Sequence, residues 1–221
     1  AVSVPADRNS APLVVLIGGL AGDDASAIAV RSTLASYEKR RVRPVHLLAV
    51  PVANPAASAL EFPPRGVAYR ERPESHVLWR WLGAQAPDLV LIAGEDKAGL
   101  ASALGAQKVA DMGRIPAQRW SGDGDWVAML GTIARSEARS ELERRRTRSP
   151  RQLAVELSRH YGRDFDQPWY IGAIALVARV KLGEQDEVRK LVDPWVDGSR
   201  DSLARPNSLI MAGHVVFTEL A

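Results

Sequence analysis

Three short apolar runs in the first half of the chain place the strongest constraint on its fold. They occupy residues 12–18, 45–52 and 88–94, and each has the length and β-branched content of a buried parallel strand. The segments between them, 24–41 and 74–86, carry apolar residues at helical spacing. Strands that alternate with helices are typical of a parallel sheet with crossover helices. We therefore predict a three-layer α/β domain with a mostly parallel sheet and flanking helices.

The second half of the chain is predicted to be helical, because the strand signal fades there. Residues 125–146 have the character of one long, increasingly charged helix, and Ser149 and Pro150 then start another as N-cap and first helical residue. The apolar stretch 168–183 is predicted to pair with 184–198 as a helical hairpin, and the last residues start a further helix. The predicted organisation is a flexible lead-in over 1–11, an α/β domain over 12–122, connecting helices over 123–164 and helical hairpins over 165–221.

Charge and composition exclude several classes of function. The 29 basic and 26 acidic residues give a net charge of only +3, and the densest arginine run, 135–151, is interleaved with glutamates, which favours a solvated helix over a nucleic-acid surface. The chain has no cysteine, which excludes disulfides, thiolate zinc sites and a cysteine nucleophile. No apolar run approaches the ~20 residues of a membrane span, so a membrane is not predicted as a partner. The low net charge likewise predicts no nucleic-acid partner. Nucleotide-binding glycine loops and the serine-hydrolase elbow are absent as well.

The two ends of the sequence bear on compartment and assembly. The first residues, "AVSVPADRNSAP", are polar and lack an initiator methionine, as expected after removal of an export signal or after trimming. Export to the periplasm or medium and a cytoplasmic location therefore both stay open. The last residues are apolar and helix-like without a polar tail, which leaves a homo-oligomer or a further C-terminal domain as two ways of covering them.

Four segments of the first half follow an order found in a known family. They read "IGGLAGDD", "LLAVPVANPAA", "RGVAYRERP" and "APDLVLIAGED", at 17–24, 47–57, 65–73 and 86–96. In this order they resemble the zinc carboxypeptidases and their succinylglutamate desuccinylase and aspartoacylase relatives. The resemblance covers roughly residues 12–100, and it implies a carboxypeptidase-like α/β domain.

The same resemblance implies a zinc site whose ligands this chain has lost. In the family the first loop supplies a histidine and a glutamate, and the third strand ends in another histidine; the matching residues here are Ala21, Asp24 and Gly94. A catalytic zinc ion needs three protein ligands and an open position for water. His46 and His76 do not replace them, because both fall inside predicted elements. We predict a fold without a metal site or another cofactor.

Carboxylates nevertheless follow two of the predicted strands, at the edge where open α/β sheets bind ligands. Asp23 and Asp24 follow the first strand, and Glu95 and Asp96 follow the third. Such a set suits oxygen coordination of Mg²⁺ or Ca²⁺, or acid/base hydrolysis of a sugar. The structural alternative is that Asp23 and Asp24 cap and charge-complement the first helix, while Asp96 caps the next. If the cleft is active, the candidate catalytic residues are Asp24, Glu95 and Asp96.

Asp23, Asn54 and three arginines complete the candidate site as ligand-binding residues. Arg65, Arg70 and Arg72 lie on the loop between the second and third strands. In the family an Asn-Arg pair on this loop grips the substrate carboxylate, and the matching residues here are Arg70 and the adjacent glutamate. An arginine beside a glutamate on a loop also forms local ion pairs, so both roles stay open.

The helical third carries a second resemblance. The sequences "DQPWYIGAIALVARVKLGEQDEVRKLVDPWVDG" and "NSLIMAGHVVFTELA" resemble the opening hairpins of the α/α-toroid glycosidases, which include unsaturated glucuronyl and rhamnogalacturonyl hydrolases. The resemblance covers about 165–221 and implies that the catalytic aspartates lie beyond residue 221. Trp169 and His214 would then line or pack the domain. An unrelated helical extension is the alternative.

Two functions follow from these observations. The first is a metal-free, carboxypeptidase-like module that binds a small molecule, saccharide or peptide without cleaving it, within a carbohydrate-processing protein. The second is an active hydrolase of peptide, acyl or glycosidic bonds that uses the carboxylates of the cleft. The missing histidines favour the first.

Overall fold

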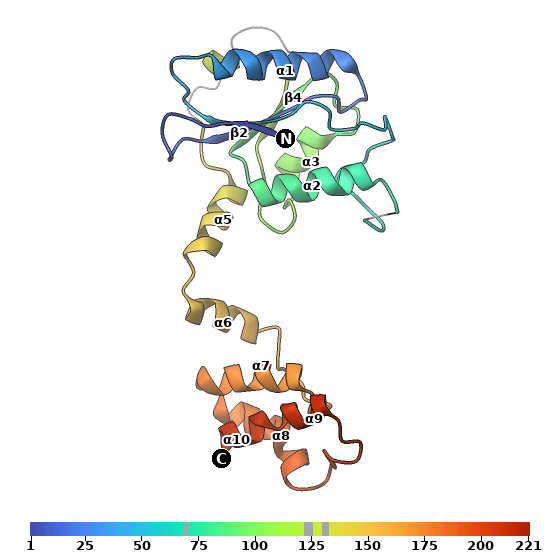
Figure 1. Cartoon of the computed structure of the whole chain (residues 1–221), viewed down its shortest axis with the longest axis vertical. Helices are drawn as coiled ribbons and strands as arrows, with labels where there is room; N and C mark the ends of the chain where they lie inside the picture. Colours follow the sequence, from blue (N-terminus) through green and yellow to red (C-terminus); the bar gives the residue numbers. More distant parts are fainter. Residues whose placement is uncertain (69, 122–125, 130–132) are drawn as a thin grey trace. The chain divides into compact units, whose positions relative to one another are not determined.

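The structure of the protein is a computed structural model that describes residues 1–68, 70–121, 126–129 and 133–221. These residues form two compact units, Ala1–Arg146 and Thr147–Ala221 (Figure 1). The first unit is an α/β fold and the second is helical, which confirms the predicted fold class at this level. The boundary between the units lies inside the segment that the sequence assigned to connecting helices.

A five-stranded sheet organises the first unit. Its order is β1-β3-β2-β4-β5, in which β1 pairs with β3 antiparallel and the other neighbours are parallel. The three apolar runs of the sequence form β2, β3 and β4, so the predicted parallel strands are confirmed. The strands are β1 Val2–Val4, β2 Leu13–Ile17, β3 His46–Val50, β4 Leu89–Ala93 and β5 Ala117–Trp120.

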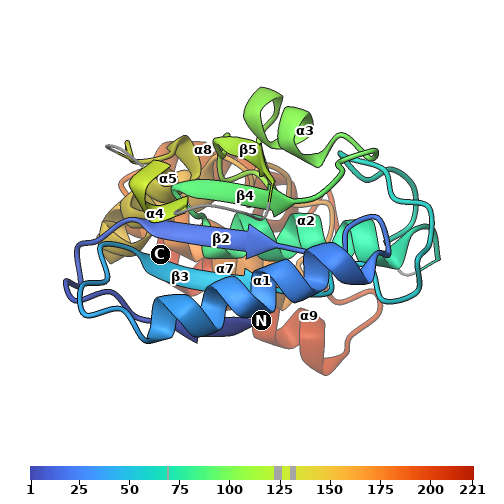
Figure 2. The same ribbon diagram turned by 90° about the horizontal axis from the view of Figure 1, so that it is seen from above.

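Helices cover both faces of this sheet. The helix α1, Asp24–Glu38, lies on one face, and α2, Pro73–Gln85, lies on the other together with α3, Leu100–Ala106 (Figures 1 and 2). Along β2, Val15 and Ile17 belong to one apolar cluster, and the alternate residues of the strand belong to the other. Burial on both faces explains why the central strands are continuous apolar runs.

Two strands differ from the sequence-based expectation. β1 lies within the segment that was predicted as a flexible lead-in, and β5 lies in a stretch for which no strand was predicted. Both are edge strands, and each is short: β1 has three residues and β5 has four. Their conformation depends on hydrogen bonds to a neighbouring strand, and a short edge strand needs no continuous apolar run.

The long helix predicted over 125–146 is also corrected, because the described residues there contain two shorter helices. These are α4, Trp126–Met129, and α5, Glu137–Thr147. The start of α5 is held by the carboxylate of Asp88, whose Oδ1 accepts a hydrogen bond from the Ser136 N–H at 3.2 Å. The Ser136 hydroxyl then caps the first turn of α5.

Asp88 ties three parts of the first unit together. It is only 6% exposed, its Oδ2 accepts from the Leu13 N–H at 2.9 Å, and its own N–H donates to the Leu13 carbonyl at 2.8 Å. The Arg139 guanidinium lies 3.8 Å from the same carboxylate. One buried side chain thus joins the start of β2, the approach to β4 and the first turn of α5.

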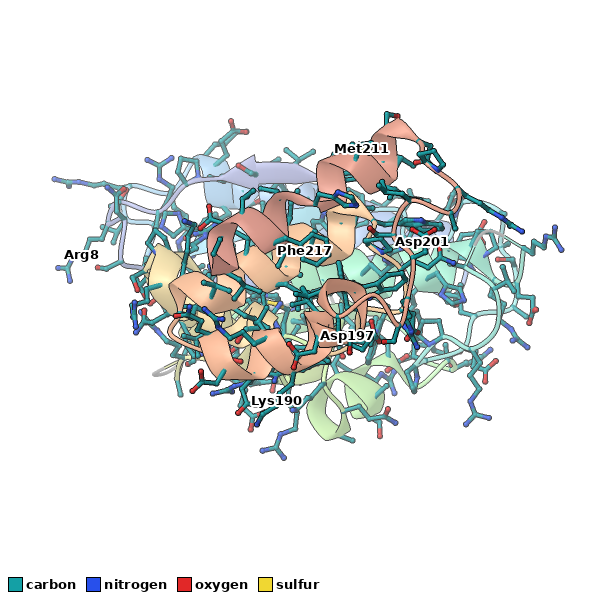
Figure 3. All side chains as sticks on the ribbon, turned by 90° about the horizontal axis from the view of Figure 1, so that it is seen from below. Arg8, Lys190, Asp197, Asp201, Met211 and Phe217 are labelled. Atoms are coloured by element: carbon teal, nitrogen blue, oxygen red, sulfur yellow. The ribbon has the colours of Figure 1, made fainter. Side chains whose placement is uncertain are left out.

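The second unit is helical, and three of its helices contribute side chains to one apolar cluster. The Ser149 cap is confirmed: Ser149 and Gln152 form a capping box, and Pro150 is the first residue of its helix. Figure 3 labels Phe217, which packs against the cluster, and Lys190 on the exposed side of its helix. The helices are α6 Pro150–Ser158, α7 Tyr170–Lys181, α8 Gln185–Val196, α9 Ser208–Gly213 and α10 Val215–Leu220. None of the helices among the described residues has both the length and the apolar character that a membrane crossing requires.

Native proteolysis tests the division into two units. Each apolar cluster lies within one unit, and the junction at Arg146 is exposed in the last turn of α5. We expect trypsin at low concentration to cut first within residues 144–148, because a helix end frays more readily than a helix centre. Mass spectrometry of the first fragments gives the site. Arg31, exposed in the middle of α1, is the internal control, and earlier cleavage there would contradict the division.

Candidate functional site

The loops that follow β2, β3 and β4 meet at the carboxyl edge of the sheet and form a pocket of about 270 Å³. Two of the predicted site residues, Asn54 and Glu95, line it. Asp23, Asp24, Asp96 and the three arginines are not among the lining residues. The lining residues are Leu20, Ala21, Asn54, Ser58, Ala59, Leu60, Glu95, Lys97 and Ala98.

Asp23 and Ser26 close the loop between β2 and α1. Asp23 is the N-cap of α1: its Oδ1 accepts from the Ser26 N–H at 2.7 Å, and its Oδ2 accepts from the Ser26 hydroxyl at 2.8 Å. The Ser26 hydroxyl in turn accepts from the Gly19 N–H at 2.8 Å. The hydrogen bonds from Ser26, first of all from its backbone N–H, hold the pKa of Asp23 below its ordinary value. Asp23 was predicted either to bind a ligand or to cap a helix, and in the structure it caps α1. Asp24 follows it as an exposed residue in the first turn of α1.

Asn54 holds the loop that follows β3. It is 3% exposed, and its Nδ2 donates to the carbonyl oxygens of Leu20 and Ser58 at 3.2 and 2.9 Å. Its Oδ1 accepts from the Ser58 N–H at 3.1 Å. The amide thus uses both donors and its acceptor within the protein, and it shapes one wall of the pocket.

The two carboxylates after β4 have different partners. Asp96 accepts from the N–H groups of Leu100 and Ala101, each at 2.8 Å, and so satisfies the start of α3. Glu95 lies 2.9 Å from the Lys97 ammonium. The hydrogen bond and charge of Lys97, with a smaller contribution from Arg119, hold the pKa of Glu95 below its usual value.

The three predicted arginines lie on the loop as expected, and two of them pair with Glu61. Arg72 forms an ion pair with Glu61, and the Arg65 Nε lies 3.6 Å from the same carboxylate. Arg70 is exposed, and its backbone N–H donates to the Val67 carbonyl. Arg65 and Arg72 therefore form local ion pairs on the loop, which was the alternative to binding a substrate carboxylate.

The residues at the positions of the family's zinc ligands do not fit a zinc ion. Ala21 and Asp24 are exposed, and Gly94 has a left-handed backbone with φ of +80°. A Cβ at Gly94 would lie 3.1 Å from the Cβ of Ser26, so the backbone leaves little room for an imidazole there. Among the described residues, no three histidine, aspartate or glutamate side chains cluster closely enough to hold a metal ion.

The histidines of this unit bind backbone groups away from the pocket. The His46 Nδ1 accepts from the Ala6 N–H at 3.2 Å, and its other ring nitrogen lies 3.2 Å from the Asn9 carbonyl oxygen. The His76 Nε2 lies 3.1 Å from the Arg65 carbonyl oxygen. Both contacts are structural, in agreement with the positions of the two residues within elements.

Sequence reasoning did not select Lys97, Ser58 or Arg119. Lys97 and Ser58 line the pocket, and the Arg119 Nε donates to the Gly94 carbonyl at 3.0 Å beside it. The position of Lys97 two residues after Glu95 in "GEDKAG" is a signal that points to an ion pair. Arg119 could not be placed, because it lies on the unpredicted edge strand β5.

A larger pocket of about 570 Å³ opens at the opposite edge of the sheet. The charged residues that line it are largely neutralised by one another: Arg139 faces Asp88, and Arg135 pairs with Glu143. His46, which also lines it, uses its acceptor nitrogen for a backbone N–H. We therefore place the candidate site in the smaller pocket, where the strands end.

The cap at Asp23 generates a stability test. We expect Asp23→Ala to lower the free energy of unfolding by about 1 kcal/mol at pH 7, the usual cost of losing an N-cap. Because the folded pKa of Asp23 is depressed, its contribution is complete above the ordinary value of 3.8 and is lost as the pH falls through the lower, folded value. Urea unfolding of the wild type and variant across that range measures it. Asp24→Ala is the matched control, with an expected loss of about 0.3 kcal/mol; equal losses would contradict the cap.

A pair of glycines tests the crowding at Gly94. Gly94 and Gly99 both have positive φ, of +80° and +72°, but a Cβ at Gly99 would meet nothing within 4 Å. We expect Gly99→Ala to cost about 1 kcal/mol from backbone strain, and Gly94→Ala to cost about 1 kcal/mol more from the contact with Ser26. Thermal or urea unfolding gives the difference. Losses of the same size would show that Ser26 does not close this position.

Comparison of the chain with protein-family models, with curated proteins and with solved structures finds no match.

Proposed function

We propose that the α/β unit is a carboxypeptidase-like module that binds a small ligand without cleaving it. The proposal rests on one observation: the candidate polar side chains form hydrogen bonds or ion pairs with other groups of the protein. Asp23 and Asp96 bind backbone N–H groups, Asn54 holds a loop, and Glu95 pairs with Lys97. Asp23, Asp96 and Asn54 have fixed partners, so they stabilise the cleft and are not available for chemistry, whereas the exposed Glu95–Lys97 pair can still contact a ligand.

The pKa directions support the same proposal. A general acid in sugar or acyl hydrolysis needs a pKa raised toward neutrality, so that it is protonated when the substrate binds. Hydrogen bonds and cations instead lower the pKa of Asp23 and Glu95, so both carboxylates are ionised at neutral pH. In the alternative of an active hydrolase, the lowered pKa excludes Glu95 from the role of the general acid.

The lining of the pocket indicates the kind of ligand. Five of its nine lining residues are alanine or leucine, and Lys97 and Glu95 supply a donor and an acceptor. A ligand with a carboxylate and hydroxyl groups matches both, because the carboxylate pairs with Lys97 and a hydroxyl donates to Glu95. The volume of about 270 Å³ lies near the small end of ligand pockets, which suits one sugar ring. We therefore propose a uronic acid, within a carbohydrate-processing protein.

The helical unit is the part of the proposal that rests on resemblance. The proposed resemblance to the first hairpins of an α/α-toroid glycosidase is consistent with the paired helices α7 and α8. It is also consistent with the saccharide ligand proposed for the first unit. Trp169 is 51% exposed, as a residue that lines a sugar site is, whereas the His214 ring packs edge-on against Phe217. Trp169 is therefore the better candidate for a sugar contact in this unit.

A titration with sugar acids tests the ligand. We expect D-galacturonate at millimolar concentration to shift amide NMR signals of residues 54–60 and 95–98, and neutral D-galactose to bind several-fold more weakly. Lys97→Met should weaken galacturonate binding about fivefold, the effect of one exposed charge contact. Lys39→Met, which removes an exposed lysine at the end of α1, is the matched control. Equal affinity of the two variants, or shifts elsewhere, would refute the site.

Hydrolysis assays separate this proposal from the active alternative. The substrates are C-terminal peptides, N-acyl amino acids and aryl glycosides. We expect the wild type to hydrolyse none of them faster than buffer alone does. The Asp24→Asn variant at the same protein concentration should give the same rates. Turnover by the wild type that disappears in Asp24→Asn or Glu95→Gln would replace the binding module with a hydrolase.

A further inference from the structure

The pocket of about 570 Å³ at the amino ends of β2 and β3 lies wholly within the first unit. Its lining residues come from β1 and β3, the loop between β1 and β2, the end of α2 and the segment around α5. Because β1 runs antiparallel to β3, with Val4 opposite Leu47, the carboxyl end of β1 and the loop that follows it also lie at this edge. The volume is ordinary for a site that binds a small molecule.

Arg139 brings a positive charge to this pocket without using its hydrogen-bond donors. Its side chain is only 17% exposed, and its Nε lies 3.8 Å from Oδ2 of Asp88, which is beyond hydrogen-bond distance. The Asp88 oxygens instead accept from the backbone N–H groups of Leu13 and Ser136. Among the residues that the structure describes, no group accepts a hydrogen bond from the Arg139 guanidinium. Asp88 therefore balances the charge of Arg139 but leaves its five N–H donors unused.

The neutral polar side chains of the pocket are unused as well. The Gln85 amide at the end of α2 is partly buried, and the lining also contains the amide of Asn9 and the hydroxyl groups of Ser3 and Ser10. Within the described parts of the chain, none of these four side chains makes a hydrogen bond. In the smaller pocket, by contrast, the buried amide uses its donors and its acceptor within the protein. The larger pocket thus offers both donors and acceptors to a bound molecule.

We propose that this pocket binds a small hydroxylated monocarboxylate, whose carboxylate is held by the Arg139 guanidinium. A planar guanidinium matches a carboxylate through two parallel hydrogen bonds. Arg135 pairs with Glu143, so the described lining residues offer no second arginine or lysine without a carboxylate partner. This balance favours a single negative charge on the ligand. The amide of Gln85 and the neighbouring polar side chains supply donors and acceptors for its hydroxyl groups.

His46 fixes one wall of the pocket before a ligand binds. Its Nδ1 accepts from the Ala6 N–H at 3.2 Å, so its Nε2 carries the proton of the neutral ring and lies 3.2 Å from the Asn9 carbonyl oxygen. Both ring nitrogens therefore hold the loop that contributes Asn9 and Ser10 to the lining. A wall that is already ordered lowers the entropy cost of binding. With one arginine–carboxylate contact we expect a Kd on the order of 0.1–1 mM.

A site-resolved NMR titration of the full chain with D-gluconate tests the ligand class. We expect gluconate to shift the amide signals of residues 9–10, 46–48 and 85. D-glucitol, which has a CH₂OH group in place of the carboxylate, should bind about tenfold more weakly. These residues are separate from 54–60 and 95–98 of the smaller pocket, so this proposal and the proposed function can fail independently. No shifts at the larger pocket, or equal binding of gluconate and glucitol, would overturn the inference.

Two variants test the side chains. Arg139→Lys keeps a positive charge beside Asp88 but loses the paired donors of the guanidinium, so gluconate should bind about tenfold more weakly. Arg146→Lys, at an exposed position in the last turn of α5, is the matched control and should bind as the wild type does.

Gln85→Leu is the second variant, because it leaves the contact between Arg139 and Asp88 intact. Loss of the amide should weaken gluconate binding about fivefold. The amide spectrum of each variant shows whether the chain is folded. Wild-type affinity in folded Arg139→Lys, or in folded Gln85→Leu, would overturn the assignment of the site.

Discussion

The hydroxyl group of Ser26 is the contact on which the carboxyl edge of the sheet depends. It accepts from the Gly19 N–H after β2 and donates to the Asp23 carboxylate at the start of α1. The Cβ of the same residue occupies the space beside Gly94, at the end of β4. Two loops and a helix terminus are thus fixed by one small side chain that is 5% exposed. A site that depends on packing this close has little room to accept a metal ligand.

The hydrogen bonds at this edge also explain why acidic residues follow the strands. In open α/β sheets the strand ends gather backbone N–H groups and helix termini, which require acceptors. Asp23 and Asp96 supply those acceptors in this protein, and Glu95 is neutralised by Lys97. Asp23 and Asp96 therefore stabilise the loops and helix starts that follow the strands.

Features that depend on local sequence could be predicted, whereas features that depend on contacts between distant parts of the chain could not. The strands β2, β3 and β4 were predictable because burial on both faces demands apolar runs, and Ser149 was predictable because capping is local chemistry. β1 and β5 depend on pairing with distant strands, and the start of α5 depends on Asp88, 48 residues away in the chain from Ser136. In the site, Asp23 and Asp96 were identified with capping as one role, whereas Arg119 could not be placed without β5.

The two units satisfy their interactions differently. In the α/β unit the buried polar side chains described above are hydrogen-bonded within the unit, so its fold is complete around a small pocket. In the helical unit, among the described residues, the buried Nε2 of His214 is without a hydrogen-bond partner. A buried polar atom without a partner costs free energy, so the packing around His214 is less favourable than the packing around the hydrogen-bonded polar groups of the α/β unit.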